Sequence, residues 1–166
     1  MTATAITSEQ IAEAARRFLT DYTTLGELKG ISHQELEAVY SLGFTHYRTG
    51  RYEDAAKLFQ FLVLFDHLNP KYWLALGAVQ QVARDFKGAI ASYAYASFLD
   101  LENPKPQFHA AECFLALGDK ENAASAILAL EEYCPKTTDT GREYLAKAAA
   151  LRKQIGEEAF AAGKTA

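Results

Sequence analysis

The chain has 166 residues, of which 49% are hydrophobic and 23% charged, and its formal net charge is −4. This length suits one domain with a proper core rather than two, and the composition is that of a globular protein rather than a disordered one. An acidic chain offers no basic face for phosphates, so we expect neither nucleic acid nor an anionic membrane as a partner. Ala (30) and Leu (19) far outnumber Val (4) and Ile (6), which favours helices over strands.

The cysteines and the N-terminus predict a cellular compartment. Cys113 and Cys134 belong to no CxxC pair and are too few for a disulfide framework, which favours a reducing compartment. Residues 1–10 lack the basic start and apolar run of a signal peptide. The longest apolar run, 61–65, is far shorter than the roughly 20 residues of a membrane span. We therefore expect a cytoplasmic protein that does not bind membranes directly.

Residues 1–35 are predicted to hold one helix and a hinge. The helix follows a capping box at Thr7 and Gln10. Its apolar residues recur at helical spacing, and they are Ile11, Ala15, Phe18, Leu19 and Tyr22. The segment 23–31 contains two glycines and is predicted to be the hinge.

The centre of the chain, residues 36–137, repeats with a period of 34 residues. The residues in register are Leu42 and Leu76; Gly43 and Gly77; Tyr52 and Phe86; Ala55, Ala89 and Ala123; Phe59, Tyr93 and Ile127; Asn69-Pro70 and Asn103-Pro104. This period and this order of residues resemble the tetratricopeptide repeat, a helix-turn-helix unit. The sequence therefore predicts three helix pairs, at about 36–69, 70–103 and 104–137.

Small residues are predicted to set the distance between the helices of a pair. Gly43 and Gly77 let the second helix approach the first, and the space between the helices is filled by large side chains at Tyr52, Phe59, Phe86 and Tyr93. Gly50 and Gly118 mark tight turns in which glycine adopts a positive φ. The third repeat departs from the pattern, with Ala111 in place of the glycine and Lys120 in place of the turn aromatic.

Residues 138–166 are predicted to form a helix and a frayed tail. The helix runs from about 139 to 160, and it carries one apolar stripe, made by Tyr144, Ala148, Leu151 and Ile155. A solenoid needs a cap over its last open face, and this helix is the candidate. The predicted fold is therefore all-α: a superhelical solenoid of three tandem tetratricopeptide repeats with flanking N- and C-terminal helices.

The sequence offers little that points to catalysis. It contains no G-x-S-x-G, no P-loop and no G-x-G-x-x-G motif. His109-x-x-Glu112 is half of a di-iron motif, and it is interpreted as a pair on a helix surface. Cys113 is predicted to be core packing, and Cys134 to be exposed before Pro135 without a neighbour that lowers its pKa. We expect no enzyme, no bound metal and no cofactor.

The repeat pattern predicts a binding groove instead. The first helix of each pair lines the concave face, and the corresponding positions are Glu37, Tyr40, Phe44 and Tyr47; Lys71, Leu74, Ala78 and Gln81; Lys105, Phe108, Glu112 and Leu115. This groove is apolar and aromatic with few fixed charges, which favours an extended apolar peptide over an acidic tail. The predicted peptide-binding residues are Tyr40, Phe44, Tyr47, Leu74, Ala78, Gln81, Phe108 and Glu112. The alternative is that the aromatic stripe of the first repeat packs on the N-terminal helix.

The segment 58–65 is apolar on every side of a helix, whereas a surface helix needs one apolar stripe. The repeat register turns Phe59 and Leu62 inward and leaves Phe61 and Phe65 pointing elsewhere. Either the N-terminal helix covers these two rings or they form a homodimer contact, with Phe18 as a further candidate.

Three stretches of the sequence carry a closer resemblance. They are residues 39–60 (VYSLGFTHYRTGRYEDAAKLFQ), 66–81 (DHLNPKYWLALGAVQQ) and 108–119 (FHAAECFLALGD), and FHAAEC is more specific than the general repeat pattern. Together with the opening helix and hinge they resemble the class II chaperones of bacterial type III secretion systems. Members of that family hold two hydrophobic translocator proteins in the cytoplasm before export. The resemblance covers about residues 10–135.

The resemblance implies what the groove binds. In the family, an extended N-terminal segment of a translocator lies in the concave face of three repeats, and its small apolar side chains enter pockets. The family's groove aromatics match Tyr40, Phe44 and Tyr47. Members also form homodimers through the N-terminal region and first repeat, which would account for Phe61 and Phe65 in the client-free chain.

The predicted function is therefore an ATP-independent cytoplasmic chaperone that masks one or two hydrophobic translocators before export. The main alternative is a generic repeat scaffold or regulatory adaptor that binds a folded partner. A hydrolase or metal protein built around His109 and Glu112 is the other alternative, and it predicts bound metal in the purified protein.

Overall fold

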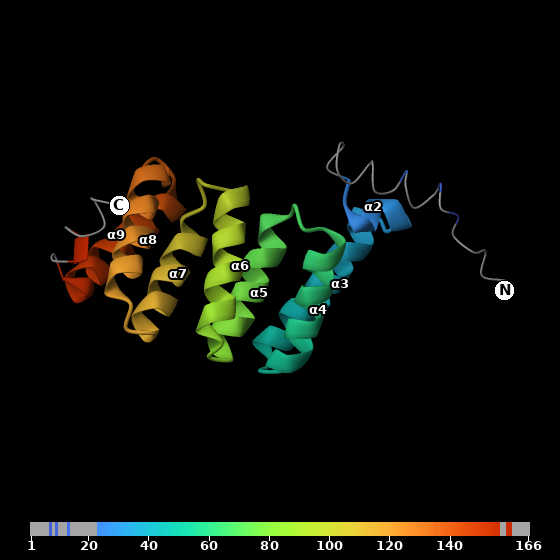
Figure 1. Cartoon of the computed structure of the whole chain (residues 1–166), viewed down its shortest axis with the longest axis horizontal. Coiled ribbons are helices and arrows are strands. Elements are labelled where there is room, and N and C mark those ends of the chain that lie inside the picture. The colour runs from blue at the N-terminus through green and yellow to red at the C-terminus, as the bar shows by residue number, and fades with distance from the viewer. Residues whose placement is uncertain (1–6, 8, 10–12, 14–22, 157–158, 161–166) are drawn as a thin grey trace.

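The computed structural model describes residues 7, 9, 13, 23–156 and 159–160, and within these ranges it contains helices and no strands. The helices are α2 (Leu25–Lys29), α3 (His33–Arg48), α4 (Tyr52–Phe65), α5 (Pro70–Val82), α6 (Phe86–Leu99), α7 (Pro104–Ala116), α8 (Lys120–Tyr133) and α9 (Asp139–Ile155). They form a single row from α2 at one end to α9 at the other (Figure 1). The predicted all-α solenoid is confirmed.

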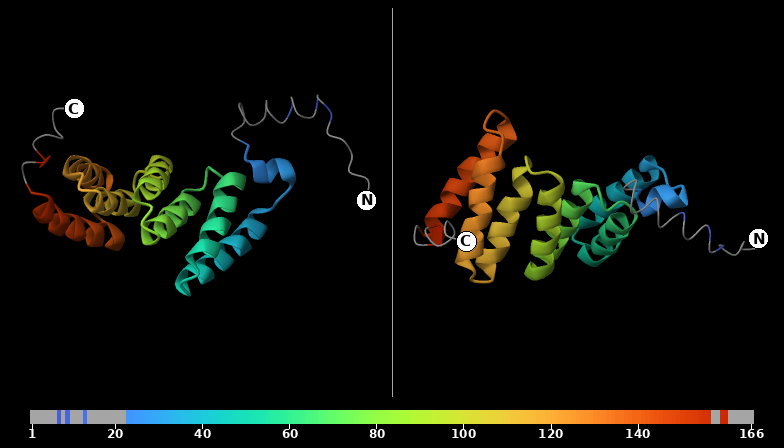
Figure 2. Two further views of the ribbon diagram at one scale, coloured as in Figure 1. Left: turned by 60° about the horizontal axis from the view of Figure 1, so that its bottom comes forward. Right: turned by 45° about the horizontal axis from the view of Figure 1, so that its top comes forward.

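The row is built from helix pairs, each packed against the next. The pairs are α3 with α4, α5 with α6, and α7 with α8, and α9 packs on both α7 and α8 at the C-terminal end. Figure 2 shows from two further sides that each pair is followed by the next along one axis. None of the helices in the described part of the chain is long and apolar enough to cross a membrane.

The recurring Asn-Pro pairs begin α5 and α7. In each pair the asparagine is the N-cap and the proline is the first helical residue. The Asn69 and Asn103 side-chain oxygens each accept a hydrogen bond of 3.2 Å, from the backbone N–H of Lys71 and of Lys105. A capping side chain followed by a residue without an N–H is a stable helix start, because both leave fewer backbone donors unsatisfied.

The close approach within a pair depends on a glycine opposite an aromatic ring. A Cβ atom on Gly43 would lie 2.8 Å from the Phe59 ring, and one on Gly77 would lie 2.6 Å from the Tyr93 ring. In the third pair the residue equivalent to these rings is the smaller Ile127. Ala111 stands there in place of the glycine and is completely buried. Ala55, Ala89 and Ala123, the three alanines in register, are completely buried. The predicted packing of the repeats is confirmed at these positions.

The turn within each pair places one residue in the left-handed region. Gly50 has φ 77° and Gly118 has φ 79°, as expected for glycine, but Arg84 occupies the equivalent position of the second pair with φ 63°. A residue with a Cβ atom pays a steric cost in this conformation that glycine does not.

The segment 23–31, which was predicted to be a hinge, contains the short helix α2. Thr24 and Glu27 form a capping box: the Glu27 carboxylate accepts from the Thr24 N–H (2.8 Å), and the Thr24 hydroxyl accepts from the Glu27 N–H (3.3 Å). Gly30 ends the helix with φ 72°. The second glycine, Gly26, is buried inside it. The predicted N-terminal helix, including Phe18, lies outside the described residues.

One other expectation needs correction at the surface of the repeats. Tyr52 is 38% exposed, although the repeat pattern assigned it to the space between the helices. Tyr52 is the first residue of α4, and its ring meets the edge of Tyr47 at the end of the pair (5.7 Å between centroids) rather than lying between the helices.

The C-terminal helix covers the last repeat as predicted, but it is shorter. Tyr144, Ala148 and Ile155 are buried in the core shared with α7 and α8, and Leu151 packs at its margin. The helix ends at Ile155 rather than near residue 160, because Gly156 follows with φ 92° and breaks the helical conformation. The predicted frayed tail, 162–166, lies outside the described residues.

Gly43→Ala tests the ring-over-glycine packing. We expect the substitution to lower the free energy of unfolding by roughly 1–2 kcal/mol, because the clash with Phe59 outweighs the helix propensity gained from alanine. Urea unfolding followed by circular dichroism measures this. In a Phe59→Leu background the same substitution should cost less, since the ring is gone. A neutral or stabilising Gly43→Ala in the wild-type background would contradict the packing.

Candidate peptide-binding groove

One face of the row is hollowed by two adjoining pockets lined mainly by α3, α5 and α7. The first, here the aromatic pocket, has a volume of about 200 Å³ and is lined by Tyr40, Phe44, Tyr47, Leu74, Ala78 and Lys105, with Phe59 among its further lining residues. The second, here the polar pocket, has a volume of about 680 Å³ and is lined by Gln81, Arg84, Tyr93, His109 and Glu112, among others. Tyr47, Ala78 and His109 border both, so the two pockets form one groove.

The aromatic pocket is preformed by stacked rings. The Tyr40 and Phe44 rings lie parallel, with 6.3 Å between centroids. Tyr40 also packs on Phe59 (5.8 Å) and on Tyr72 (5.9 Å), both of which are buried. Phe44 is 46% exposed. Tyr40 is therefore half core and half pocket wall, whereas Phe44 leaves about half of its surface uncovered by the described residues.

A polar clamp joins α3 to α5 beside this pocket. The Lys71 ammonium donates to the Glu37 carboxylate at 2.6 Å and lies 3.9 Å from the centre of the Tyr40 ring. The Tyr72 hydroxyl donates to the same carboxylate at 3.1 Å. The hydrogen bond from Lys71 holds the pKa of Glu37 below its ordinary value. The pKa of Tyr72 is raised, mainly by burial and also by the hydrogen bond to Glu37. The charge of Lys71 is thus balanced within the protein.

A chain of hydrogen bonds crosses the polar pocket and links α5, α6 and α7. The Tyr93 hydroxyl donates to the Gln81 oxygen (2.7 Å), and the Gln81 amide donates to the Glu112 carboxylate (3.2 Å). His109 Nδ1 lies 2.8 Å from the same carboxylate. Burial alone would raise the pKa of Glu112, but the bonds from His109 and Gln81 hold it below its ordinary value. Glu112 is therefore a carboxylate within a satisfied network.

The structure brings together most of the predicted groove residues. Tyr40, Phe44, Tyr47, Leu74 and Ala78 line the aromatic pocket, and Gln81 and Glu112 line the polar one.

Phe108 does not line either pocket. It is buried in the core, with its ring 5.4 Å from Tyr144 of α9, because α9 takes the place that a following repeat would occupy. Leu115, at another groove position of the third repeat, also packs against this core.

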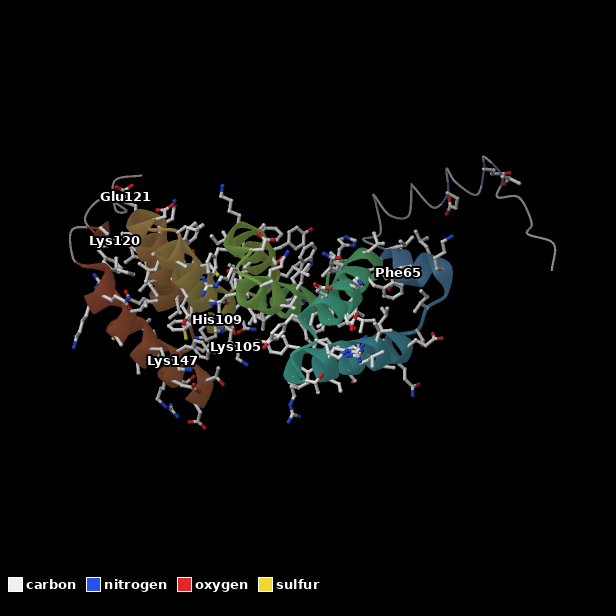
Figure 3. All side chains as sticks on the ribbon, turned by 90° about the horizontal axis from the view of Figure 1, so that it is seen from below. Phe65, Lys105, His109, Lys120, Glu121 and Lys147 are labelled. Atoms are coloured by element: carbon white, nitrogen blue, oxygen red, sulfur yellow. The ribbon has the colours of Figure 1, made fainter. Side chains whose placement is uncertain are left out.

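Sequence reasoning missed several residues of the groove, among them His109 and Arg84. His109 borders both pockets, although the sequence presented it only as part of a surface pair, and Figure 3 shows it beside Lys105. Arg84 lines the polar pocket from the turn after α5. The sequence signal that could have indicated Arg84 is its position in the repeat, since the other two repeats have glycine there.

The described residues hold no group of three or more His, Cys, Asp or Glu side chains that could bind a metal ion. His109 and Glu112 form a pair on α7, and their side chains are 32% and 37% exposed. Cys113 is buried, which raises the pKa of its thiol to about 12. Cys134 was expected to be exposed, but it is buried, and its thiol donates to the Gly141 carbonyl oxygen at 3.6 Å.

The rings Phe61 and Phe65 lie on α4, outside the groove. Their centroids are 4.3 Å apart, and Phe61 is 38% exposed. Figure 3 shows Phe65 well separated from Lys105 and His109. The alternative that the N-terminal helix covers these rings, or the stripe of the first repeat, falls on residues outside the described ranges.

Three helix pairs with a hollowed face define a tetratricopeptide-repeat protein, and the profile of the tetratricopeptide repeat family matches residues 36–69. The chain is 36% identical to low calcium response locus protein H of Yersinia pestis over 150 residues, which are 87% of this chain and 89% of that protein. A type III secretion system complex from Aeromonas hydrophila contains a chain that is similar in structure, with a TM-score of 0.80 and 36% identity over 86% of this chain and 95% of that chain.

The Yersinia enterocolitica type III secretion chaperone SycD, solved in complex with a peptide of the translocator YopD, superposes with a TM-score of 0.71 and 36% identity over 75% of this chain and 95% of that chain. The chain therefore belongs to the family of type III secretion chaperones.

The Glu112 network predicts a pH dependence of stability. Because the pKa of Glu112 is held below its ordinary value of 4.5, its contribution to folding is fully present above pH 4.5 and is lost as the pH falls through the lowered pKa. We expect Glu112→Gln to be less stable than wild type at neutral pH, by less than about 1 kcal/mol since the carboxylate is partly exposed, and the difference to shrink below pH 4.5.

Urea titrations at several pH values measure this difference. Glu102→Gln removes the same charge from an exposed turn and serves as the matched control. An equal pH dependence in both variants would contradict a special role of the network.

Proposed function

We propose that this chain acts in the bacterial cytoplasm as an ATP-independent chaperone that binds an extended apolar N-terminal segment of a hydrophobic translocator in its groove. The observation that carries the proposal is the half-exposed Phe44 ring stacked on Tyr40 at the wall of a preformed pocket. Membership of the type III secretion chaperone family supports it, as does the YopD peptide bound by SycD.

Binding without covalent chemistry is enough for this task. A translocator segment that must later enter a membrane exposes apolar side chains, and covering them in the groove removes apolar surface from water. The segment loses conformational entropy when it is ordered, so the affinity must come from a few well-packed anchors. The preformed rings of the aromatic pocket limit the ordering cost on the side of the chaperone.

Phe44→Ala tests the groove directly. Because Phe44 is 46% exposed, we expect its truncation to leave helicity and unfolding unchanged, and to weaken binding of the YopD peptide by about 2 kcal/mol, roughly 30-fold, if Phe44 is an anchor. Isothermal titration calorimetry measures the affinity. The matched control is Phe98→Ala, which removes another exposed ring, 76% exposed, that does not line the groove.

Three outcomes separate the alternatives. Equal binding by Phe44→Ala and wild type would move the site to another face. Loss of fold in Tyr40→Ala or Tyr47→Ala, with binding retained in Phe44→Ala, would make the stripe a core element. No binding of the peptide by the wild-type chain would favour the alternative of a scaffold that binds a folded partner.

We further propose that the client-free chain forms a homodimer through Phe61 and Phe65. The two rings are in contact on α4, tilted by 30° to each other, and Phe61 is 38% exposed. An exposed apolar surface of this kind is typical of an interface.

Phe61→Glu should therefore shift the protein from dimer to monomer without loss of helicity, since the side chain is already 38% exposed. Size-exclusion chromatography with light scattering gives the mass. Phe98→Glu places the same charge on an exposed ring of another repeat and should leave the mass unchanged. A Phe61→Glu protein that is still dimeric, or a wild-type chain that is already monomeric, would refute this interface.

A further inference from the structure

The groove carries more positive than negative side chains, although the chain as a whole has a net charge of −4. Lys71, Arg84 and Lys105 line the two pockets, and Glu112 is the one carboxylate among the described lining residues. Lys71 is paired with Glu37, whereas the Glu112 carboxylate accepts a hydrogen bond from Gln81 and lies 2.8 Å from His109 Nδ1. The two cations of the groove whose side chains have no hydrogen-bond or ion-pair partner among the described residues are Arg84 and Lys105.

Lys105 differs from Lys71 although the two lysines occupy equivalent positions 34 residues apart. Both border the aromatic pocket, from α5 and α7 respectively. The Lys71 side chain has a carboxylate at 2.6 Å, whereas the Lys105 side chain forms neither a hydrogen bond nor an ion pair with any residue in the described ranges. Among the described residues, Lys105 is thus a cation without a partner that lines an apolar pocket.

Arg84 departs from the repeat at a turn position where the other two pairs have glycine. The equivalent residues, Gly50 and Gly118, adopt the same left-handed turn, and Arg84 adopts it at φ 63° despite its Cβ atom. Backbone strain of this kind clusters at ligand-binding and other functional sites. The Arg84 side chain lines the polar pocket and has no hydrogen-bond or ion-pair partner among the described residues. Within the described residues, no hydrogen bond or ion pair of this side chain therefore offsets the strain.

Both cations are suited to a carboxylate on the bound segment. A guanidinium offers a planar set of donors that matches a carboxylate, and an ammonium at the rim adds a point charge. Neighbouring packed helices lie roughly 8–10 Å apart, and an extended chain advances about 3.3 Å per residue. On an extended client segment, a side chain that enters the aromatic pocket and a side chain that lies beside the next helix would thus be about three residues apart.

We propose that Arg84 and Lys105 select client segments that carry an acidic side chain within a few residues of the apolar anchor. This inference rests on the proposed function, and it adds the charge interaction by which the groove would distinguish one apolar segment from another. It also accounts for the strained turn, since arginine at position 84 is retained for binding at the expense of the fold.

A positional scan of the YopD peptide tests the proposal. Each position is replaced in turn by Asp and by Lys, and affinities are measured by fluorescence anisotropy for wild type, Arg84→Gly, Lys105→Gln and Lys120→Gln. Lys120 begins α8 and lies apart from Lys105 in Figure 3, so Lys120→Gln controls for the loss of one positive charge. Thermal unfolding of Arg84→Gly is measured in parallel.

We expect wild type and Lys120→Gln to bind Asp about ten-fold more tightly than Lys at one or two positions, which is the sum of two modest charge interactions. This preference should fall severalfold in Arg84→Gly or Lys105→Gln, and added salt should weaken it. Arg84→Gly should bind the peptide less tightly but unfold at a higher temperature. A purely structural role of Arg84 would not lower the affinity while raising the unfolding temperature.

Two results would overturn the proposal while leaving the proposed function intact. One is binding of the parent peptide by wild type with no position that prefers Asp to Lys. The other is a preference that is unchanged in both Arg84→Gly and Lys105→Gln. Failure of wild type to bind the parent peptide would overturn the proposed function, and this inference with it.

Discussion

The approach of a ring to a glycine sets the geometry on which the rest of this molecule depends. Phe59 lies over Gly43 and Tyr93 lies over Gly77, and neither glycine has room for a Cβ atom. The same two rings then reach the groove, where Phe59 borders the aromatic pocket and Tyr93 the polar one. The spacing of the helices and the depth of the pockets are therefore set by the same contacts, so the core and the binding surface cannot vary independently.

Polar links between repeats lie on the groove side, whereas apolar clusters hold the interior. Glu37 joins α3 to α5 through Lys71 and Tyr72, and Gln81 joins α5 to α6 and α7 through Tyr93 and Glu112. Hydrogen-bonded side chains of this kind have few alternative rotamers. The groove is consequently shaped before any ligand arrives, and ordering on binding falls mainly on the partner.

The period of 34 residues was enough to predict the helix pairs and the wall of the aromatic pocket, because register decides which side of a helix a residue occupies. Register failed where the array ends. Phe108 has the groove position of Tyr40, but α9 follows the third pair and covers it. The helix α2 was missed because two glycines suggested a hinge, although the Thr24–Glu27 capping box was present in the sequence. Arg84 was missed because its effect depends on a backbone angle.

The buried side chains fall into three separate clusters, one centred on Phe59, one on Tyr93 and one on Ile127, rather than into one continuous core. In such an array each unit is stabilised by its contacts with its nearest neighbours, and a unit can open locally without global unfolding. A segment lying along α3, α5 and α7 would contact all three units at once. Occupancy of the groove would then make the whole row cooperative, slowing amide hydrogen exchange in units that it barely touches.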